Sequence, residues 1–272
     1  MALMLISRGS FSGGQVIAQC LSKSAGMTCL TREDLIASVN RQGQIATRIT
    51  AAMAKAAQNY AQFSALRRPY KILMRLALLE YAHEDSIAYF GYSGHLLLQG
   101  ISHAVRVRII APLELRIKLM MSREKLTEDE ARDRIRESDE ERTRWTRFMY
   151  GKTLGDPHLF DLCLNLERIS FPAACCMMLR LAQESDFQPT PESLAEVENQ
   201  YLSTRVLAAL VTDPQTYDVE ISATAQAGQV TLEGPYLEDS EKSVVLDIVN
   251  AVTGVQQVQY IEGYQAVAEF VS

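Results

Sequence analysis

The first 25 residues constrain the fold more than any other part of the chain. A short apolar run, residues 2–6, leads into the polar turn Ser7–Gly14, and a helical pattern continues from Gln15 to Ala25. This order predicts a buried strand, a turn of small residues and a helix. Backbone N–H groups at such a turn add to the positive end of the helix dipole, so the arrangement favours an anion such as phosphate.

The turn is an incomplete match to the standard phosphate-binding loop, G-x-x-x-x-G-K-[ST]. Aligning Gly13 with the last glycine puts Arg8 at the first glycine, Gly14 at the lysine and Gln15 at the hydroxyl. An ordinary strand-to-helix turn also uses Gly and Ser, for their freedom of backbone angle. On this segment alone, a phosphate site and a plain turn are equally open.

Composition indicates a soluble globular chain with one large domain and a smaller one, since 47% of its 272 residues are hydrophobic. Acidic and basic residues are interleaved between Arg116 and Arg147, so no nucleic-acid partner is expected. The five cysteines lack a C-x-x-C pair and predict buried thiols in a reducing cytoplasm, with no metal site. No segment approaches the roughly 20 apolar residues of a membrane-spanning helix.

Further along, helical patterns separate short apolar segments, which predicts a parallel α/β sheet with helices on both faces. A long helical stretch from Arg32 is expected to break near Pro69, and a capping box at Thr127 begins a charged helix. In such a sheet the turns at Arg8–Gly14 and Gly91–Gly94 both lie at the carboxyl ends of strands. Strands are expected at 28–30, 86–91, 105–111 and 159–164, and a helix from Ser170 to about Glu184.

The pattern of apolar and polar residues changes at segment 185–191. This segment is polar and contains two prolines, which predicts a linker. Beyond it come a helix and two alternating strands that flank Gln226-Ala227-Gly228, a hairpin signal. A helix at 240–252 and a strand at 255–261 complete a small α+β module. Residues 204–272 carry ten acidic and two basic side chains, so no attraction to an anionic membrane is expected.

In consistent order, the motifs of residues 2–184 resemble the cytidylate-kinase-like P-loop family. The resemblance implies a nucleoside-monophosphate-kinase fold that uses ATP and Mg²⁺ and accepts CMP or dCMP. The matching residues are Ser7-Arg8, Ser12-Gly13-Gly14, Ile17-Ala18, Gly91 with Gly94, Val107–Pro112 with Arg116, Ala131, Ile135, Asp139, Arg142, Tyr150-Gly151, Asp161-Leu162 and Asn165.

The resemblance also assigns roles to individual residues. Donor phosphates are expected at Arg8, Ser10, Ser12, Gly13, Gly14 and Gln15. Catalytic roles in a mobile lid are expected for Arg132, Arg142 and Asp139, and acceptor binding for Arg68, Lys71, Gly91, Tyr92 and Gly94. A plainer interpretation stands beside each role: lid arginines also form ordinary i, i+4 ion pairs, such as Glu128 with Arg132.

Two positions depart from the family pattern. Gln15 and Tyr92 stand where arginine is usual, and each loses a positive charge that could face phosphate. The alternative to a kinase is therefore a nucleotide sensor without catalysis, and a third possibility is a scaffold that has lost nucleotide binding.

Residues 203–272 are similar to a BON domain, at Val206–Leu210, at Gly228 with Val230–Gly234, and at Gly254-Val255. The similarity implies a small binding module, for which a protein partner, self-association or a small ligand is expected. The expected organisation is a kinase-like domain (1–184), a linker with the start of a short helix (185–202) and a BON-like domain (203–272).

Overall fold

The structure, a computed structural model, describes residues 3–55, 60–84, 86–91 and 93–263. The chain forms two compact units. The first comprises Met1–Asp34 with Glu84–Thr190, and the second comprises Leu35–His83 with Pro191–Ser272. One border between the units, after Thr190, falls within the linker expected at 185–202.

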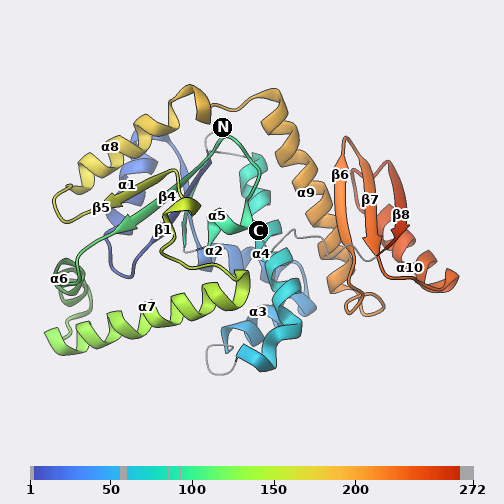
Figure 1. The fold of residues 1–272 in the computed structure, drawn as a ribbon, viewed down its shortest axis with the longest axis horizontal. Helices are drawn as coiled ribbons and strands as arrows, with labels where there is room; N and C mark the ends of the chain where they lie inside the picture. Colours follow the sequence, from blue (N-terminus) through green and yellow to red (C-terminus); the bar gives the residue numbers. More distant parts are fainter. Residues whose placement is uncertain (1–2, 56–59, 85, 92, 264–272) are drawn as a thin grey trace. The chain divides into compact units, whose positions relative to one another are not determined.

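The first unit is built on a five-stranded parallel sheet in the order β2-β3-β1-β4-β5 (Figure 1). This sheet confirms the predicted α/β class. In the register of β1 with its neighbours, Ser7 lies beside Gly91 on one side and Arg108 on the other. The loops after these strands therefore begin at one edge of the sheet. The strands are β1 (Leu3–Arg8), β2 (Thr28–Thr31), β3 (Ile87–Gly91), β4 (Ala104–Ile110) and β5 (Leu162–Asn165).

Two helices, α1 (Gly14–Ala25) and α8 (Phe171–Ala182), pack side by side on the sheet (Figure 1). Ile17 of α1 and Met178 of α8 are fully buried in one apolar cluster with strand residues such as Ile6. Leu5 and Tyr89, on the other face of the sheet, are at most 2% exposed. Burial on both faces explains why these strands are continuous apolar runs rather than alternating ones.

The other helices of the first unit are short or highly charged. A single turn, α5 (Gly94–Leu97), packs on β1 and β3. Two 3-10 turns are η3 (Pro157–Leu159) and η4 (Ser185–Phe187). The pair α6 (Leu113–Glu124) and α7 (Glu128–Tyr150) shares a small apolar cluster of Ile117, Met120, Ala131 and Ile135.

Thr127 begins α7 as predicted. Its hydroxyl accepts from the Glu130 amide, and the Glu130 carboxylate accepts from the Thr127 amide (2.8 Å), which completes the capping box. Among the described helices, none combines the length and the apolar character that crossing a membrane requires.

The second unit joins helices to a small sheet, in which β6 (Ser222–Gln226) is antiparallel and β8 (Gln257–Glu262) parallel to β7 (Gln229–Gly234). The turn between β6 and β7 consists of Ala227 and Gly228, with φ of 49° and 85°. Two positive φ angles are typical of a type I′ turn, so the predicted hairpin is confirmed. Its helices are α3 (Gln44–Ala54), the 3-10 helix η2 (Tyr60–Leu66), α4 (Arg67–Glu84), α9 (Pro191–Thr212) and α10 (Asp239–Asn250), and α2 (Arg32–Arg41) crosses the border from the first unit.

Two boundaries differ from the sequence-based expectation, and one agrees with it. The helical stretch from Arg32 is interrupted at Gly43, whose φ of 131° few other residues adopt. The interruption expected near Pro69 is present: the 3-10 helix η2 ends at Leu66 and α4 begins at Arg67. Pro69 itself lies in the first turn of α4, where an N–H has no intrahelical acceptor. The strand expected at 159–164 begins only at Leu162, since Leu159 is the last residue of η3.

Cysteine pairing also differs from the expectation. Cys20 on α1 and Cys175 on α8 form a disulfide, so the prediction of five thiols is wrong for this pair. Cys29, Cys163 and Cys176 are free thiols. The two bonded cysteines are 155 residues apart in sequence, and only the packing of α1 against α8 brings them together.

We expect three thiols to react with DTNB in denaturant without reductant, and five after reduction, because two of the five cysteines are bonded. Reduction should also lower the free energy of unfolding, by up to about 4–5 kcal/mol if the bond acts by closing a long loop of the unfolded chain. A variant with Cys20→Ser and Cys175→Ser serves as the control and should not respond to reductant. Five reactive thiols before reduction would contradict the assignment.

Candidate functional site

The candidate site is the Gly9–Gly14 loop, which joins β1 to α1 and includes the first residue of α1. The Gly9 amide donates to the Ile109 carbonyl of β4 (3.2 Å), and the Ser12 hydroxyl donates to the Gly9 carbonyl (2.9 Å). These bonds fold the loop against the strand ends. Phe11 and Gly13 have positive φ, 56° and 77°, and Gly13 is the N-cap of α1. The predicted turn of small residues is thus a tight loop that leads directly into a helix.

Three backbone amides of this loop lack an acceptor among the described residues. Within the described part of the chain, the N–H groups of Phe11, Gly13 and Gly14 donate no hydrogen bond. Gly14 opens α1, where N–H groups have no intrahelical acceptor and the helix dipole is positive. This is the arrangement that binds phosphate at helix N-termini.

Gly13 and Gly14 are too closely packed to carry a side chain. A Cβ on Gly13 would overlap the Phe171 ring, and one on Gly14 would overlap the side chain of Arg8. Arg8 therefore crosses the N-terminus of α1 directly over Gly14. Its Nε is buried and has no hydrogen-bond partner among the described residues, so an anion here would gain an unused donor.

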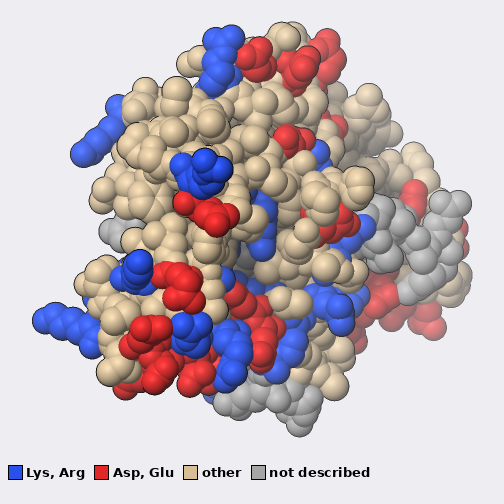
Figure 2. Space-filling model, turned by 60° about the vertical axis from the view of Figure 1, so that its left-hand side comes forward, with Lys and Arg blue, Asp and Glu red and all other residues tan. Residues whose placement is uncertain are grey.

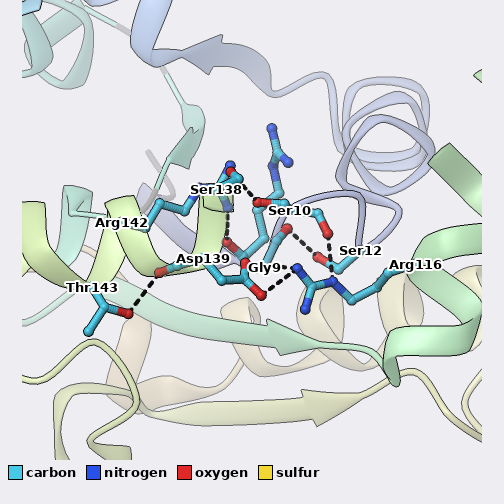
Figure 3. A network of polar contacts seen from close by, with 9 residues as sticks. Gly9, Ser10, Ser12, Arg116, Ser138, Asp139, Arg142 and Thr143 are labelled. Carbon is cyan, nitrogen blue, oxygen red and sulfur yellow. Dashed lines mark hydrogen bonds and ion pairs between the residues drawn. The ribbon is translucent and has the colours of Figure 1, made fainter. Parts of the chain in front are cut away.

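Side chains from α6 and α7 hold the loop (Figure 3). Arg116 of α6 donates from Nε to the Ser10 carbonyl (2.7 Å), and its terminal nitrogen contacts both carboxylate oxygens of Asp139 on α7 (2.8 and 2.7 Å). The hydroxyl groups of Ser10 and Ser138 lie 2.7 Å apart. The predicted residues Ser10 and Asp139 are therefore brought together, with Arg116 between them.

Positive charge concentrates at the same place. Arg142 of α7 donates to the Arg8 carbonyl oxygen (2.9 Å). Burial lowers the pKa of Arg8, and the charge of Arg142 lowers it further. The same two causes, in the same order, lower the pKa of Arg108. Because arginines stay charged at neutral pH, each guanidinium here lies in the positive field of another, and an anion among them would be stabilised.

Sequence reasoning missed Arg108, Ser138 and Phe171. Arg108 lies near the carboxyl end of β4 and donates to the Ser7 hydroxyl (2.7 Å). An arginine inside an otherwise buried strand is costly, and its place near the ligand-binding edge of a parallel sheet was a usable signal. Ser138 and Phe171 carry no such signal, since a serine in a charged helix and an aromatic at a helix start are both common.

Arg132, a predicted catalytic residue, lies elsewhere on α7. Its guanidinium pairs with Glu128 (2.9 Å) and with Glu114 (3.4 Å), as the plainer interpretation has it. Arg134 likewise pairs with Glu124 (2.6 Å). Basic and acidic side chains are intermingled over the face that Figure 2 shows. A catalytic role for Arg132 stays a prediction.

The second glycine turn begins beside the first. Gly91 ends β3 next to Ser7, and Gly94 opens α5. A Cβ on either glycine would overlap the Tyr89 side chain, so the close packing of this ring requires both. Tyr92 and the side chain of Gln15 lie outside the described residues.

His95 follows this turn and is 3% exposed. Neither ring nitrogen has a partner among the described residues, and the ring packs against Phe160 with centroids 4.5 Å apart. Burial, and then the charges of Arg108 and Arg106, lower the pKa of His95 to about 3. The imidazole is therefore neutral at pH 7 and has one donor and one acceptor unused.

Arg68 and Lys71, expected at the acceptor, belong to the second unit. Arg68 donates to the carbonyl oxygens of Val219 and Ile221, in the segment before β6. Lys71 of α4 is 3% exposed. Their role toward an acceptor phosphate stays a prediction.

The described residues do not fit a magnesium ion held by the protein. No group of three or more His, Cys, Asp or Glu among them could hold a metal. The Ser12 hydroxyl is directed to the Gly9 carbonyl, and both oxygens of Asp139 contact Arg116. Any Mg²⁺ at this loop would therefore take its ligands mainly from nucleotide phosphates and water.

Comparison with known families identifies the family of this chain. A model of the cytidylate kinase-like family matches residues 5–168, more than half of the chain. The matched segment includes both glycine turns and α7. The chain belongs to the cytidylate kinase-like family. The match confirms the predicted family and supports a kinase-like, nucleotide-binding protein. It ends before residues 203–272, so their similarity to a BON domain stays a prediction. None of the curated proteins matches the chain significantly.

Solved structures resemble this cytidylate kinase-like protein over about two thirds of its length. An uncharacterized protein from Eubacterium ventriosum is 17% identical with a TM-score of 0.54, over 68% of this chain and 99% of that one. A Thermus thermophilus protein is 18% identical, with a TM-score of 0.46 and coverages of 68% and 98%. A shikimate kinase from Bacteroides thetaiotaomicron is 10% identical, with a TM-score of 0.40 and coverages of 67% and 99%. At these identities a likeness concerns the fold alone.

His95 should make stability depend on pH below neutrality. Its pKa is about 3 in the folded protein, against an ordinary 6.5, so the unfolded chain binds more protons between these values. Stability is therefore full above pH 6.5 and falls as the pH decreases toward 3. Between pH 7 and pH 5 the wild type should lose about 2 kcal/mol more than His95→Leu, measured by urea unfolding. Equal losses in the two proteins would refute the buried neutral imidazole.

Proposed function

We propose that the chain binds ATP with its phosphates on the Gly9–Gly14 loop and transfers the terminal phosphoryl group to CMP or dCMP. The observation that carries the proposal is the Arg8 side chain over Gly14, with its buried Nε unpartnered among the described residues. In the standard loop a lysine follows the last glycine and reaches the phosphates. Here Gly14 takes the position of that lysine. The side chain of Arg8, which lies over Gly14, would supply the positive charge instead.

Transfer requires that an acceptor phosphate oxygen attacks the terminal phosphorus while the bond to the bridging oxygen of ADP breaks. Little covalent chemistry falls to the protein, which must align the two ends and neutralise the spreading negative charge. We assign this neutralisation to Arg8, Arg108 and Arg142; burial lowers the pKa of Arg8 and of Arg108, and the charge of Arg142 lowers both further. Asp139 is a positioning residue that holds Arg116 against the loop. Magnesium bound with the nucleotide would add further positive charge.

The acceptor is proposed beside the second glycine turn. Gly91 is next to Ser7 in the sheet, so a ligand there would reach the first loop from the neighbouring strand. The unused donor and acceptor of His95 lie one residue beyond Gly94 and suit the edge of a nucleobase. Arg68 and Lys71 line a separate cavity in the second unit, for which an organic phosphate is proposed below.

A second candidate is a nucleotide sensor that binds ATP without turnover. Gln15 and Tyr92 replace expected arginines, and Arg132 is paired with glutamates at the surface of α7. Residues 203–272, which we propose to be BON-like, would then pass the signal to a protein partner or a second copy of the chain. The two candidates share the phosphate loop and differ in whether ADP is released.

The first test is binding of MgATP by isothermal titration calorimetry. Arg8→Met should weaken binding about tenfold or more, because a charge-assisted hydrogen bond is lost. Arg136→Met is the matched control: this residue is exposed on α7, pairs with Asp133 and should leave affinity unchanged. Absence of MgATP binding to the wild type would contradict both proposed functions, the kinase and the sensor.

The second test measures ADP release with CMP, dCMP and the other nucleoside monophosphates in a coupled assay. As a kinase, the wild type should turn over CMP or dCMP, and Arg142→Met should lower kcat by at least about tenfold, because charge in the transition state is left unneutralised. Turnover that appears only in the double variant Gln15→Arg, Tyr92→Arg would instead establish the sensor. Equal kcat in wild type and Arg142→Met would contradict the assigned role.

A further inference from the structure

The second unit contains a cavity of about 1040 Å³ that the phosphate loop does not share. Its walls come from α3, η2 and the start of α4 on one side, and from α9 and the strands β6 and β7 with their flanking residues on the other. A volume of this size lies at the upper end of the range for small-molecule sites.

The floor of the cavity is apolar and closely packed. Ile72 of α4 is 1% exposed, Leu207 and Val211 of α9 are 4% and 2% exposed, and Ile221 before β6 is 2% exposed. These side chains come from different elements and are almost fully buried, so the floor is a continuous apolar surface. Apolar walls of this kind suit a hydrocarbon or ring body.

One wall carries positive charge. Arg48, Arg67, Arg68 and Lys71 all line the cavity, three of them within five residues at the start of α4. Arg68 is fixed by its bonds to the Val219 and Ile221 carbonyls. Lys71 is the deepest of the four at 3% exposed, and burial followed by the charges of Arg67 and Arg68 lowers its pKa to about 8. A cluster of this kind favours an anion beside the Lys71 amine.

The opposite rim bears Asp218, Glu220 and Glu233, with the half-exposed ring of Tyr217 next to them. Carboxylates here would repel a second anionic end and would accept hydrogen bonds from hydroxyl or amino groups. Asp218 and Glu220 flank Val219, whose carbonyl oxygen accepts from Arg68, so the acidic segment meets the basic wall at Arg68. The buried amine of Lys71 marks the end of the cavity that suits an anion.

We propose that this cavity binds an organic phosphate, with the phosphate against Lys71 and Arg68 and an apolar or aromatic body on the floor formed by α4 and α9. Two sources share this chemistry: a nucleotide, whose hydroxyl and amino groups would meet the acidic rim, and an alkyl or acyl phosphate, which has none. The proposal is independent of ATP binding at the Gly9–Gly14 loop.

The test uses 8-anilinonaphthalene-1-sulfonate, an anion on an aromatic body, followed by fluorescence on the full chain. We expect one saturable site, with affinity about tenfold weaker in Lys71→Met, which loses the buried charge, and about threefold weaker in Arg48→Met at the exposed rim. Lys118→Met, an exposed lysine of α6, is the control and should bind as the wild type does. The neutral analogue N-phenyl-1-naphthylamine should not distinguish the variants. Circular dichroism and the unfolding midpoint show that each variant is folded.

Displacement of the dye shows which of the two kinds of organic phosphate binds in the cavity. AMP displaces the dye if the ligand is a nucleotide, and octyl phosphate does so if it is an alkyl phosphate. Each displacement should persist in Arg8→Met, so failure at the phosphate loop and failure at the cavity are separate results. The proposal is overturned if neither phosphate displaces the dye, or if Lys71→Met and Arg48→Met both bind it as tightly as the wild type does.

Discussion

Arg116 joins the three elements on which the site depends. It extends from α6, donates to the Ser10 carbonyl of the loop and pairs with Asp139 of α7, so one guanidinium fixes the loop and the charged helix together. This pair also explains how several arginines can surround the loop. Asp139 neutralises Arg116, while Arg8 and Arg142 add positive charge next to the loop. The fold thus holds its cations in place before any anion arrives, which is how a preorganised phosphate site avoids reorganisation on binding.

Sequence reasoning succeeded where neighbouring residues determine the structure. The capping box at Thr127 and Glu130 and the hairpin turn at Ala227-Gly228 are both decided within four residues. The parallel sheet was predictable because its strands are apolar runs separated by helical patterns. The candidate loop was predictable for the same reason, since Arg8 to Gly14 form one continuous segment.

What the sequence did not reveal depends on packing between distant segments. Phe171 meets Gly13, and Cys175 meets Cys20, only because α8 lies against α1. Both contacts join segments more than 150 residues apart, and no local propensity encodes them. The position of Arg132 is a different case: the spacing to Glu128 predicted an ion pair, and the family resemblance predicted a catalytic lid. The structure has the ion pair, because a salt bridge one turn away needs no ligand.

The composition of the second unit changes how the C-terminal module is understood. Arg75 of α4 donates to Gln200 of α9 (3.0 Å), and His83 at the end of α4 contacts Glu198 (2.8 Å). Residues after 190 therefore form one compact unit with the segment that lies between β2 and β3 in the sequence. Moreover, α4 leads within a few residues to β3, which ends at Gly91 beside the first loop.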